Sequence, residues 1–223
     1  MKIKWNVRGV ASLAMVTTMS VQAQAFVLNF SSVPSLTAGV VFENGSFEFN
    51  NAASGLYSGY SLQITDSSGV GDSVGDLGKI NGTFTIGTIT VSGNDQSAPV
   101  TGAGLLNISD GSLDLTGNLV WNSISTSGTG GDINIMGLLN LTSISYGGTQ
   151  SDLQALAAAG TASDVVSFSF DPGLTLTQLH DETSPTKTDF SGVITTSVPE
   201  SNNVYFLSFV FAGAEWLRRK LRK

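Results

Sequence analysis

Short runs of alternating apolar and polar residues, separated by glycine-containing turns, constrain the fold of this chain most. In "GVVFENGSFEFN" (residues 39–50), two such runs flank Asn44-Gly45, a pair that accepts positive φ at both positions and favours a two-residue hairpin turn. "LLNISDGSLDL" repeats this arrangement around Asp110-Gly111. Because successive side chains of a strand point to opposite faces, the pattern predicts β-hairpins with one buried face.

Further segments carry the same alternation. "TFTIGTITV" and "DINIMGLLNLTSISY" alternate with a slip of one position, at Gly87 and before Ile144, and the slip at Gly87 predicts a bulge there. "DVVSFSFDPG" places Val166, Phe168 and Phe170 on one face, and "DFSGVITTS" is typical of a last strand.

A single helix is expected, in "SDLQALAAAG". Ser151 suits the N-cap, Asp152 lies at the positive end of the helix dipole, and Gly160 is a natural stop. Such a short helix would cover a sheet edge or the mouth of a barrel. The sequence therefore predicts an all-β fold, a β-sandwich or barrel-like domain with one short helix. A β-helix is the alternative, because residues 102–148 form a long chain of short apolar runs.

The charge of the chain is unevenly distributed and excludes some functions. Between Phe26 and Val198 there are 15 acidic and 2 basic residues, a net charge of −13. This balance argues against nucleic acid as a partner, because nucleic-acid binding needs basic patches. The chain has no cysteine, which excludes disulfides, thiolate chemistry and cysteine-type zinc sites.

No arrangement of residues in the sequence indicates a catalytic site. The one histidine, His180, precedes Asp181 and Glu182 in a polar segment, which fits an exposed loop better than a catalytic dyad. Glu43 and Glu48 are the only glutamates on predicted strands, and both belong to one hairpin. We therefore expect a protein that is not an enzyme. The alternative is a secreted hydrolase of polysaccharide or ester groups that uses paired carboxylates.

One loop suggests a cofactor. In "DSSGVGDSVGDLG", Asp66, Asp72 and Asp76 gather within a Gly/Ser-rich stretch, and carboxylate oxygens are the ligands that calcium prefers. The spacing matches neither the EF-hand nor the calcium β-roll, so a solvated loop without metal is the other interpretation.

The first 25 residues have the pattern of a secretory signal peptide. A positively charged start is followed by a short apolar stretch and by the small-x-small site Ala23-Gln24-Ala25, which predicts cleavage after Ala25. An N-terminal helix of the folded domain is the alternative.

The last 26 residues combine a short apolar segment with a basic end. Residues 204–217 would form a helix of only about 21 Å, against a hydrocarbon core of roughly 30 Å. Positive charge holds a chain end in the cytoplasm, so the body would lie outside the membrane and the tail inside. The basic residues are Arg218, Arg219, Lys220, Arg222 and Lys223.

Val198-Pro199-Glu200, followed by this apolar segment and the arginine-rich end, resembles the PEP-CTERM sorting signal of Gram-negative bacteria. The resemblance implies recognition by exosortase, an integral-membrane protease that cuts at the motif. It also implies a membrane helix before processing, and a final place at the cell surface or in an extracellular polysaccharide or biofilm matrix.

These patterns together predict three segments. Residues 1–25 form a signal peptide, residues 26–197 form a β-rich exported domain, and residues 198–223 form the sorting segment. The predicted protein is an exported, non-enzymatic surface or matrix protein whose body acts in adhesion or polysaccharide contact.

Overall fold

A computed structural model describes residues 25–128 and 134–196, which belong to one compact unit. Within these residues, thirteen strands form a single sheet accompanied by two short helices. The all-β prediction is confirmed. The β-helix alternative is wrong, because its strands would pair in parallel, whereas every pair of named strands here is antiparallel.

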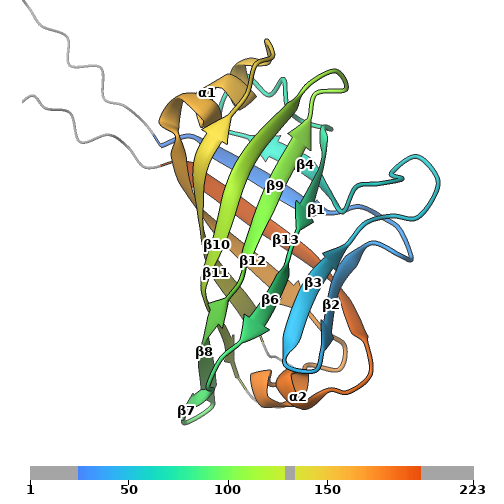
Figure 1. The fold of residues 1–223 in the computed structure, drawn as a ribbon, viewed down its shortest axis with the longest axis vertical. Coiled ribbons are helices and arrows are strands. Elements are labelled where there is room, and N and C mark those ends of the chain that lie inside the picture. The colour runs from blue at the N-terminus through green and yellow to red at the C-terminus, as the bar shows by residue number, and fades with distance from the viewer. Residues whose placement is uncertain (1–24, 129–133, 197–223) are drawn as a thin grey trace, which may run out of the picture. The chain divides into compact units, whose positions relative to one another are not determined.

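Four neighbouring strands, including the longest of the sheet, form a continuous layer, called the wall below (Figure 1). Along each strand the side chains alternate between a buried inner face and an outer face, as the period of two predicted. On β12, Val166 and Phe168 are buried and Phe170, just after the strand, packs against the same core. The wall consists of β10 (Asp114–Ser127), β11 (Asn134–Ser145), β12 (Thr161–Ser169) and β13 (Thr186–Thr196).

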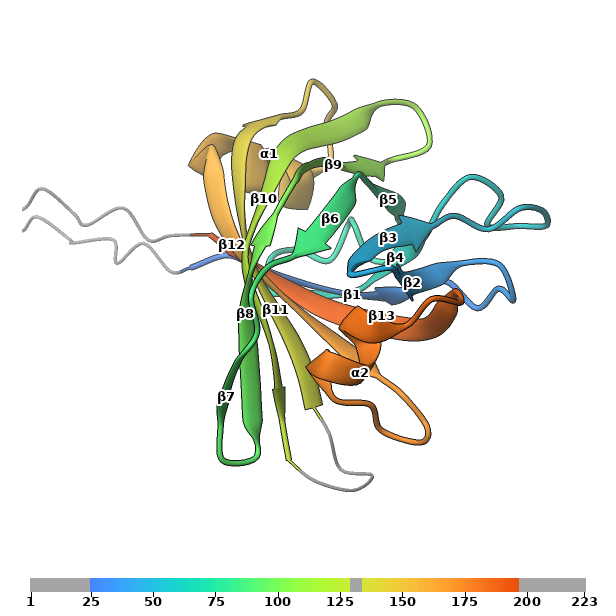
Figure 2. The same cartoon turned by 60° about the horizontal axis from the view of Figure 1, so that its bottom comes forward.

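Each outer strand of the wall pairs with two different strands along its length. β10 pairs with β9 through its first half and with β8 through its second half. β13 pairs with β2 near its start and with β1 near its end. Two four-stranded arms therefore connect β10 to β13, so the sheet closes on itself twice (Figures 1 and 2). The first arm is β1 (Val27–Ser32), β4 (Leu62–Ser67), β5 (Leu77–Asn81) and β9 (Ala103–Ser109); the second is β2 (Gly39–Glu43), β3 (Ser46–Asn50), β6 (Thr83–Ile86) and β8 (Asp95–Thr101).

The turns follow the sequence in one hairpin and differ from it in another. Asn44 and Gly45 have φ of 50° and 71°, which is the predicted two-residue turn between β2 and β3. The β9–β10 hairpin exists, but a two-residue turn at Asp110-Gly111 is wrong: residues 110–113 form the connection. The Asp110 carboxylate organises it by accepting hydrogen bonds from the N–H groups of Ser112 and Leu113.

Both predicted slips in the alternation mark irregularities in the sheet. At Gly87 the chain leaves the sheet after β6 and returns as β7 (Thr90–Ser92), and both strands pair with β8. The predicted bulge is therefore a break of three residues. Before Ile144, the register against β10 shifts and Ser143 adopts a φ of 52°.

Two helices lie at opposite ends of the sheet (Figure 1). α1 (Ser151–Ala159) packs against β11 and β12, and it ends at Gly160 with φ of 70°, as predicted. Ser151 is not its N-cap: Gln150 holds that position and its side chain makes no capping hydrogen bond. α2 (Leu176–Asp181) was not expected from the sequence. Its start is fixed by a capping box in which the Thr175 and Gln178 side chains each bind the other's backbone.

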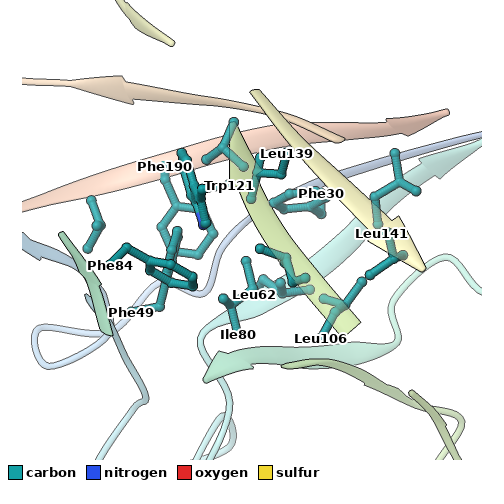
Figure 3. Close-up of a cluster of buried hydrophobic side chains, with 14 of the residues drawn as sticks. Phe30, Phe49, Leu62, Ile80, Phe84, Leu106, Trp121, Leu139, Leu141 and Phe190 are labelled. Carbon is teal, nitrogen blue, oxygen red and sulfur yellow. The ribbon is translucent and has the colours of Figure 1, made fainter. Parts of the chain in front are cut away.

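The wall and the two arms enclose one hydrophobic core, and the core differs between its two ends (Figure 3). Towards the first arm it consists mainly of leucine and isoleucine, such as Leu62, Ile80 and Leu106. Towards the second arm it is built of aromatic rings around Phe47 and Trp121. These regions are called the aliphatic half and the aromatic half below.

Several predictions fall on residues outside the described ranges. They include the signal peptide with Ala23, the sorting motif Val198-Pro199-Glu200, the apolar C-terminal segment and the basic stop; Ala25 is the first described residue. Among the helices that the structure describes, none combines the length and apolarity needed to cross a membrane.

Candidate functional site

A pocket of about 220 Å³ lies in the aliphatic half, near the start of α1. Three different connections supply its carboxyl and tyrosine side chains. Tyr60 comes from the segment before β4, Asp76 from the loop before β5, and Asp110 from the β9–β10 turn. We call it the carboxylate pocket; Gly75, Leu77, Ser109 and Gly111 complete its lining.

The loop before β5 is fixed by reciprocal hydrogen bonds with α1. Asp152, buried in the first turn of the helix, accepts hydrogen bonds from the N–H groups of residues 70–71 and from the hydroxyl of Ser73, at 2.9–3.0 Å. In return, Asp72 accepts the N–H groups of Ser151 and Asp152 at 2.6 and 3.0 Å. The Asp72 carboxylate thus satisfies free N–H groups at the helix start, where an anion is also favoured by the helix dipole.

Asp76 is the pocket residue with an incompletely satisfied side chain. Its Oδ1 accepts a hydrogen bond from Gln150 Nε2 at 3.3 Å, while its buried Oδ2 has no partner among the described residues. Burial raises the pKa of Asp76 to about 6; the Gln150 hydrogen bond opposes this rise, and the charges of Asp110, Asp72 and Asp152 add to it. Near pH 6 this carboxyl group is therefore present in both its protonated and its ionised form.

Asp110 has the opposite electrostatic character. Its Oδ2 accepts a hydrogen bond from the Tyr146 hydroxyl, and its Oδ1 accepts the N–H groups of Ser112 and Leu113, each at 2.7 Å. These donors, with Tyr146 first, hold the pKa of Asp110 below its ordinary value. Burial, followed by the Asp110 hydrogen bond, raises the pKa of Tyr146, so the tyrosine stays a donor at neutral pH.

This arrangement suits a ligand that carries several hydroxyl groups. An ionised carboxylate accepts hydrogen bonds only, whereas a carboxyl group with a pKa near 6 can accept or donate. Tyr60 adds an aromatic ring with an apolar face and a polar tip. No lysine or arginine lines the pocket, so nothing in its described lining would pair with an anionic ligand.

The three aspartates of the predicted calcium site do not meet. Asp66 accepts hydrogen bonds from the Asn29 side chain and the Ser67 N–H, Asp72 binds the start of α1, and Asp76 lies in the pocket. In residues 25–128 and 134–196, no three His, Cys, Asp or Glu side chains form a group that could hold a metal ion. Calcium binding stays a prediction, which isothermal titration of the chain with calcium would test.

The other candidate residues lie elsewhere. His180 is on α2, not in a loop, and its Nδ1 lies 2.9 Å from Asp181 Oδ1. It borders a depression between α2 and the β6–β7 break. Glu43 and Glu48 lie on one hairpin, as predicted, beside another shallow depression. None of these residues lines the carboxylate pocket.

Reasoning from the sequence missed most of the pocket. The sequence indicates Asp110 only as a turn residue, and it carries no signal for a role of Tyr146 or Tyr60. The β5–β9 and β9–β10–β11 pairings bring these distant segments together. No spacing within the sequence indicates that proximity.

No family model, no curated protein and no solved structure matches this chain. Any inference about its function therefore rests on the geometry of the described residues and on the sequence patterns.

Proposed function

We propose that this chain is an exported, non-enzymatic surface or matrix protein whose body binds carbohydrate in the carboxylate pocket. One observation supports this most: Asp76, whose pKa is raised to about 6, and Asp110, which is ionised, line the same pocket with the ring of Tyr60. Sugar hydroxyls would bind the carboxyl groups, and the apolar face of a sugar ring would pack on the tyrosine.

Size and charge narrow the ligand. A volume of about 220 Å³ is below the roughly 300–1,000 Å³ of pockets that bury drug-sized ligands, so the pocket suits one sugar unit of a longer chain. The surrounding acidic residues would repel an anionic polysaccharide. The expected ligand is therefore an uncharged glycan.

A glycan array followed by titration calorimetry tests the pocket. We expect Asp76→Asn and Tyr60→Ala to weaken binding of any glycan found by about tenfold or more, the loss of a well-placed hydrogen bond or ring contact. Asp66→Asn is the matched control, because Asp66 lies outside the pocket and should leave affinity unchanged. Equal affinity in the wild type and both pocket variants would reject the site.

Export and sorting form the second part of the proposal. The signal peptide would direct the chain out of the cytoplasm, and an exosortase-type protease would cut near Pro199-Glu200, releasing the body to the cell surface or matrix. An epitope inserted at the exposed residues 54–56 would report location, and the mass of the mature C-terminus would report cleavage. A full-length cytoplasmic chain would contradict export, and an exported chain with an intact C-terminus would indicate permanent tethering.

A hydrolase is the second candidate function, because the environments of the two carboxyl groups move their pKa values apart. Such a split is how two carboxyl groups take the roles of acid and base in glycoside hydrolysis. Asp76 would protonate the leaving group and Asp110 would act as base or nucleophile. Under this alternative, turnover falls as pH rises through about 6, and Asp76→Asn abolishes turnover while binding remains. Binding without turnover supports the non-enzymatic proposal.

A further inference from the structure

The outer face of the wall carries an exposed apolar row. Leu138 on β11 pairs with Val165 on β12, which pairs with Val193 on β13, so the three side chains lie next to one another. Leu138 is 44 % exposed and Val193 is 37 % exposed. Met136, two residues before Leu138 on the same face, is half exposed. Contiguous exposed apolar side chains of this kind mark interaction surfaces.

Uncharged residues, most of them serine, threonine or asparagine, surround this row. On one side Met136 pairs with Ser167, which pairs with Ser191; on the other side Asn140, Ser163 and Thr195 are paired in the same way. Serines of β12, β13 and β1 also line a hollow of about 380 Å³ there, which leaves room for side chains of a partner. An apolar centre with an uncharged polar rim is the anatomy of a protein–protein interface.

The charge distribution selects the partner. The three paired rows just described contain no charged side chain, although the body carries a net charge of −13 and Asp66 and Asp189 lie at the border of the face. Two acidic copies repel each other, and contact through these rows brings no carboxylate of either copy to the centre of the interface. A basic partner would find no opposite charge in these rows. A glycan would find no aromatic ring in them.

We infer that a second copy of this chain docks on the outer face of the wall. The contact is isologous, as in most homodimers, and the two outer faces stack like the sheets of a sandwich. Val165 occupies the middle of the apolar row, so it lies near the two-fold axis and faces its own equivalent.

The size of the face indicates a weak dimer. The three rows continue onto β10 on one side and onto β1 on the other. Strands are about 4.8 Å apart and residues on one face about 6.8 Å apart along a strand, so these five strands by three rows cover roughly 500 Å² per copy. The total of roughly 1,000 Å² is at the lower limit of specific interfaces. Dimerisation should therefore depend on concentration.

Sedimentation velocity of the full-length chain over a dilution series tests the inference. We expect Leu138→Lys and Leu138→Glu each to weaken the dimer at least about tenfold, because either charge would be buried without a partner. Lysine lowers the net negative charge, so a loss with both signs cannot come from general repulsion. Val91→Lys and Val91→Glu, at an exposed valine on β7, are matched controls and should leave the dimer intact.

A second measurement does not depend on those variants. The chain has no cysteine, so Val165→Cys introduces a single thiol close to the proposed axis, and a short thiol-reactive cross-linker should join two copies. Val91→Cys should not cross-link in this way. Circular dichroism verifies folding, and Val193→Lys replaces Leu138→Lys if the latter does not fold.

Three outcomes would overturn the inference. The first is a dimer that persists in the charged variants of the face. The second is a thiol at position 165 that cross-links no better than the thiol at position 91. The third is a chain that stays monomeric while a glycan protects the thiol at position 165 from modification. That result would assign this face to carbohydrate.

Discussion

The aromatic and aliphatic halves of the core are stabilised in different ways. The aromatic half packs phenylalanine rings around Phe47 and Trp121, with ring centroids 4.8 Å apart for that pair. The aliphatic half is filled by leucine and isoleucine and contains five of the six buried polar residues described, among them Asp152 and Asp164. The carboxylate pocket belongs to this second half.

This difference has a physical reason. Aromatic rings pair edge to face and bury large areas, so the aromatic half needs few polar contacts. The aliphatic half must hold two loops and a helix around a pocket, and backbone groups there require acceptors. Asp152 supplies them from the interior. One half is therefore stabilised mainly by packing, and the other half partly by a polar network that also shapes the site.

The largest expected effect is on the aromatic half. Phe47 contacts five rings, Phe42, Phe49, Phe84, Trp121 and Phe168, at centroid distances of 4.8–6.4 Å. Phe47→Ala should lower the free energy of unfolding by about 4 kcal/mol, through lost burial and the cavity left behind. Leu106→Ala, at a fully buried position in the aliphatic half, should cost about 3 kcal/mol. Urea denaturation measures both, and a larger loss in Leu106→Ala would contradict the comparison.

The next effect tests the polar network. Asp152→Ala removes the acceptor of buried N–H and hydroxyl groups and should destabilise the chain by about 3 kcal/mol. Asp72→Ala, which removes a more exposed acceptor at the start of α1, is the control and should cost about 1 kcal/mol. If the two variants lose equal stability, burial is not what makes Asp152 important.

The pH dependence of Asp152 has a defined sign. Burial raises its pKa, but hydrogen bonds from donors including Ser73 and Val70 outweigh burial and leave the pKa below the ordinary value of 3.8. Its stabilising effect is therefore present above that value and is lost as pH falls through the lower pKa of the folded state. The difference between wild type and Asp152→Ala should shrink in acid.

One substitution, of the buried residue Asp164, should stabilise the aliphatic half. Asp164 points into the core from β12, and neither of its oxygens has a partner among the described residues. Burial raises its pKa well above the ordinary value, so the folded chain keeps a proton that the unfolded chain releases. Wild-type stability therefore falls as pH rises above about 4. Asp164→Val should unfold with a free energy about 1–2 kcal/mol higher at neutral pH, and a less stable variant there would reveal a missed partner.

The two halves also differ in how well the sequence predicted them. Alternation indicated some strands in both halves, because burial of one face leaves a local signal, as in Phe168 on β12. It did not indicate β1, β4 and β5 of the first arm or β8 of the second. The six residues of α2 are too few to show helical periodicity. Only the pairing of Thr175 with Gln178 at capping-box spacing could have indicated that helix.

The pocket was beyond prediction for a different reason. Asp76, Asp110 and Tyr146 come from three segments that non-local strand pairing brings together. Local sequence patterns do not indicate which strands pair to form the two arms that connect β10 to β13. The sequence identified the loop of Asp76 as polar and acidic, but not the partners of each carboxylate.

The smallest effect concerns the charge balance within the pocket. Asp76 should titrate with a pKa of about 6, observable by NMR of its carboxyl carbon. Asp110→Asn removes one like charge acting on Asp76, so it should lower that pKa. Asp114→Asn, a nearby carboxylate on β10 that does not line the pocket, should leave it unchanged. An ordinary pKa for Asp76 in the wild type would mean that water reaches Oδ2 and that burial does not set the protonation of this pocket.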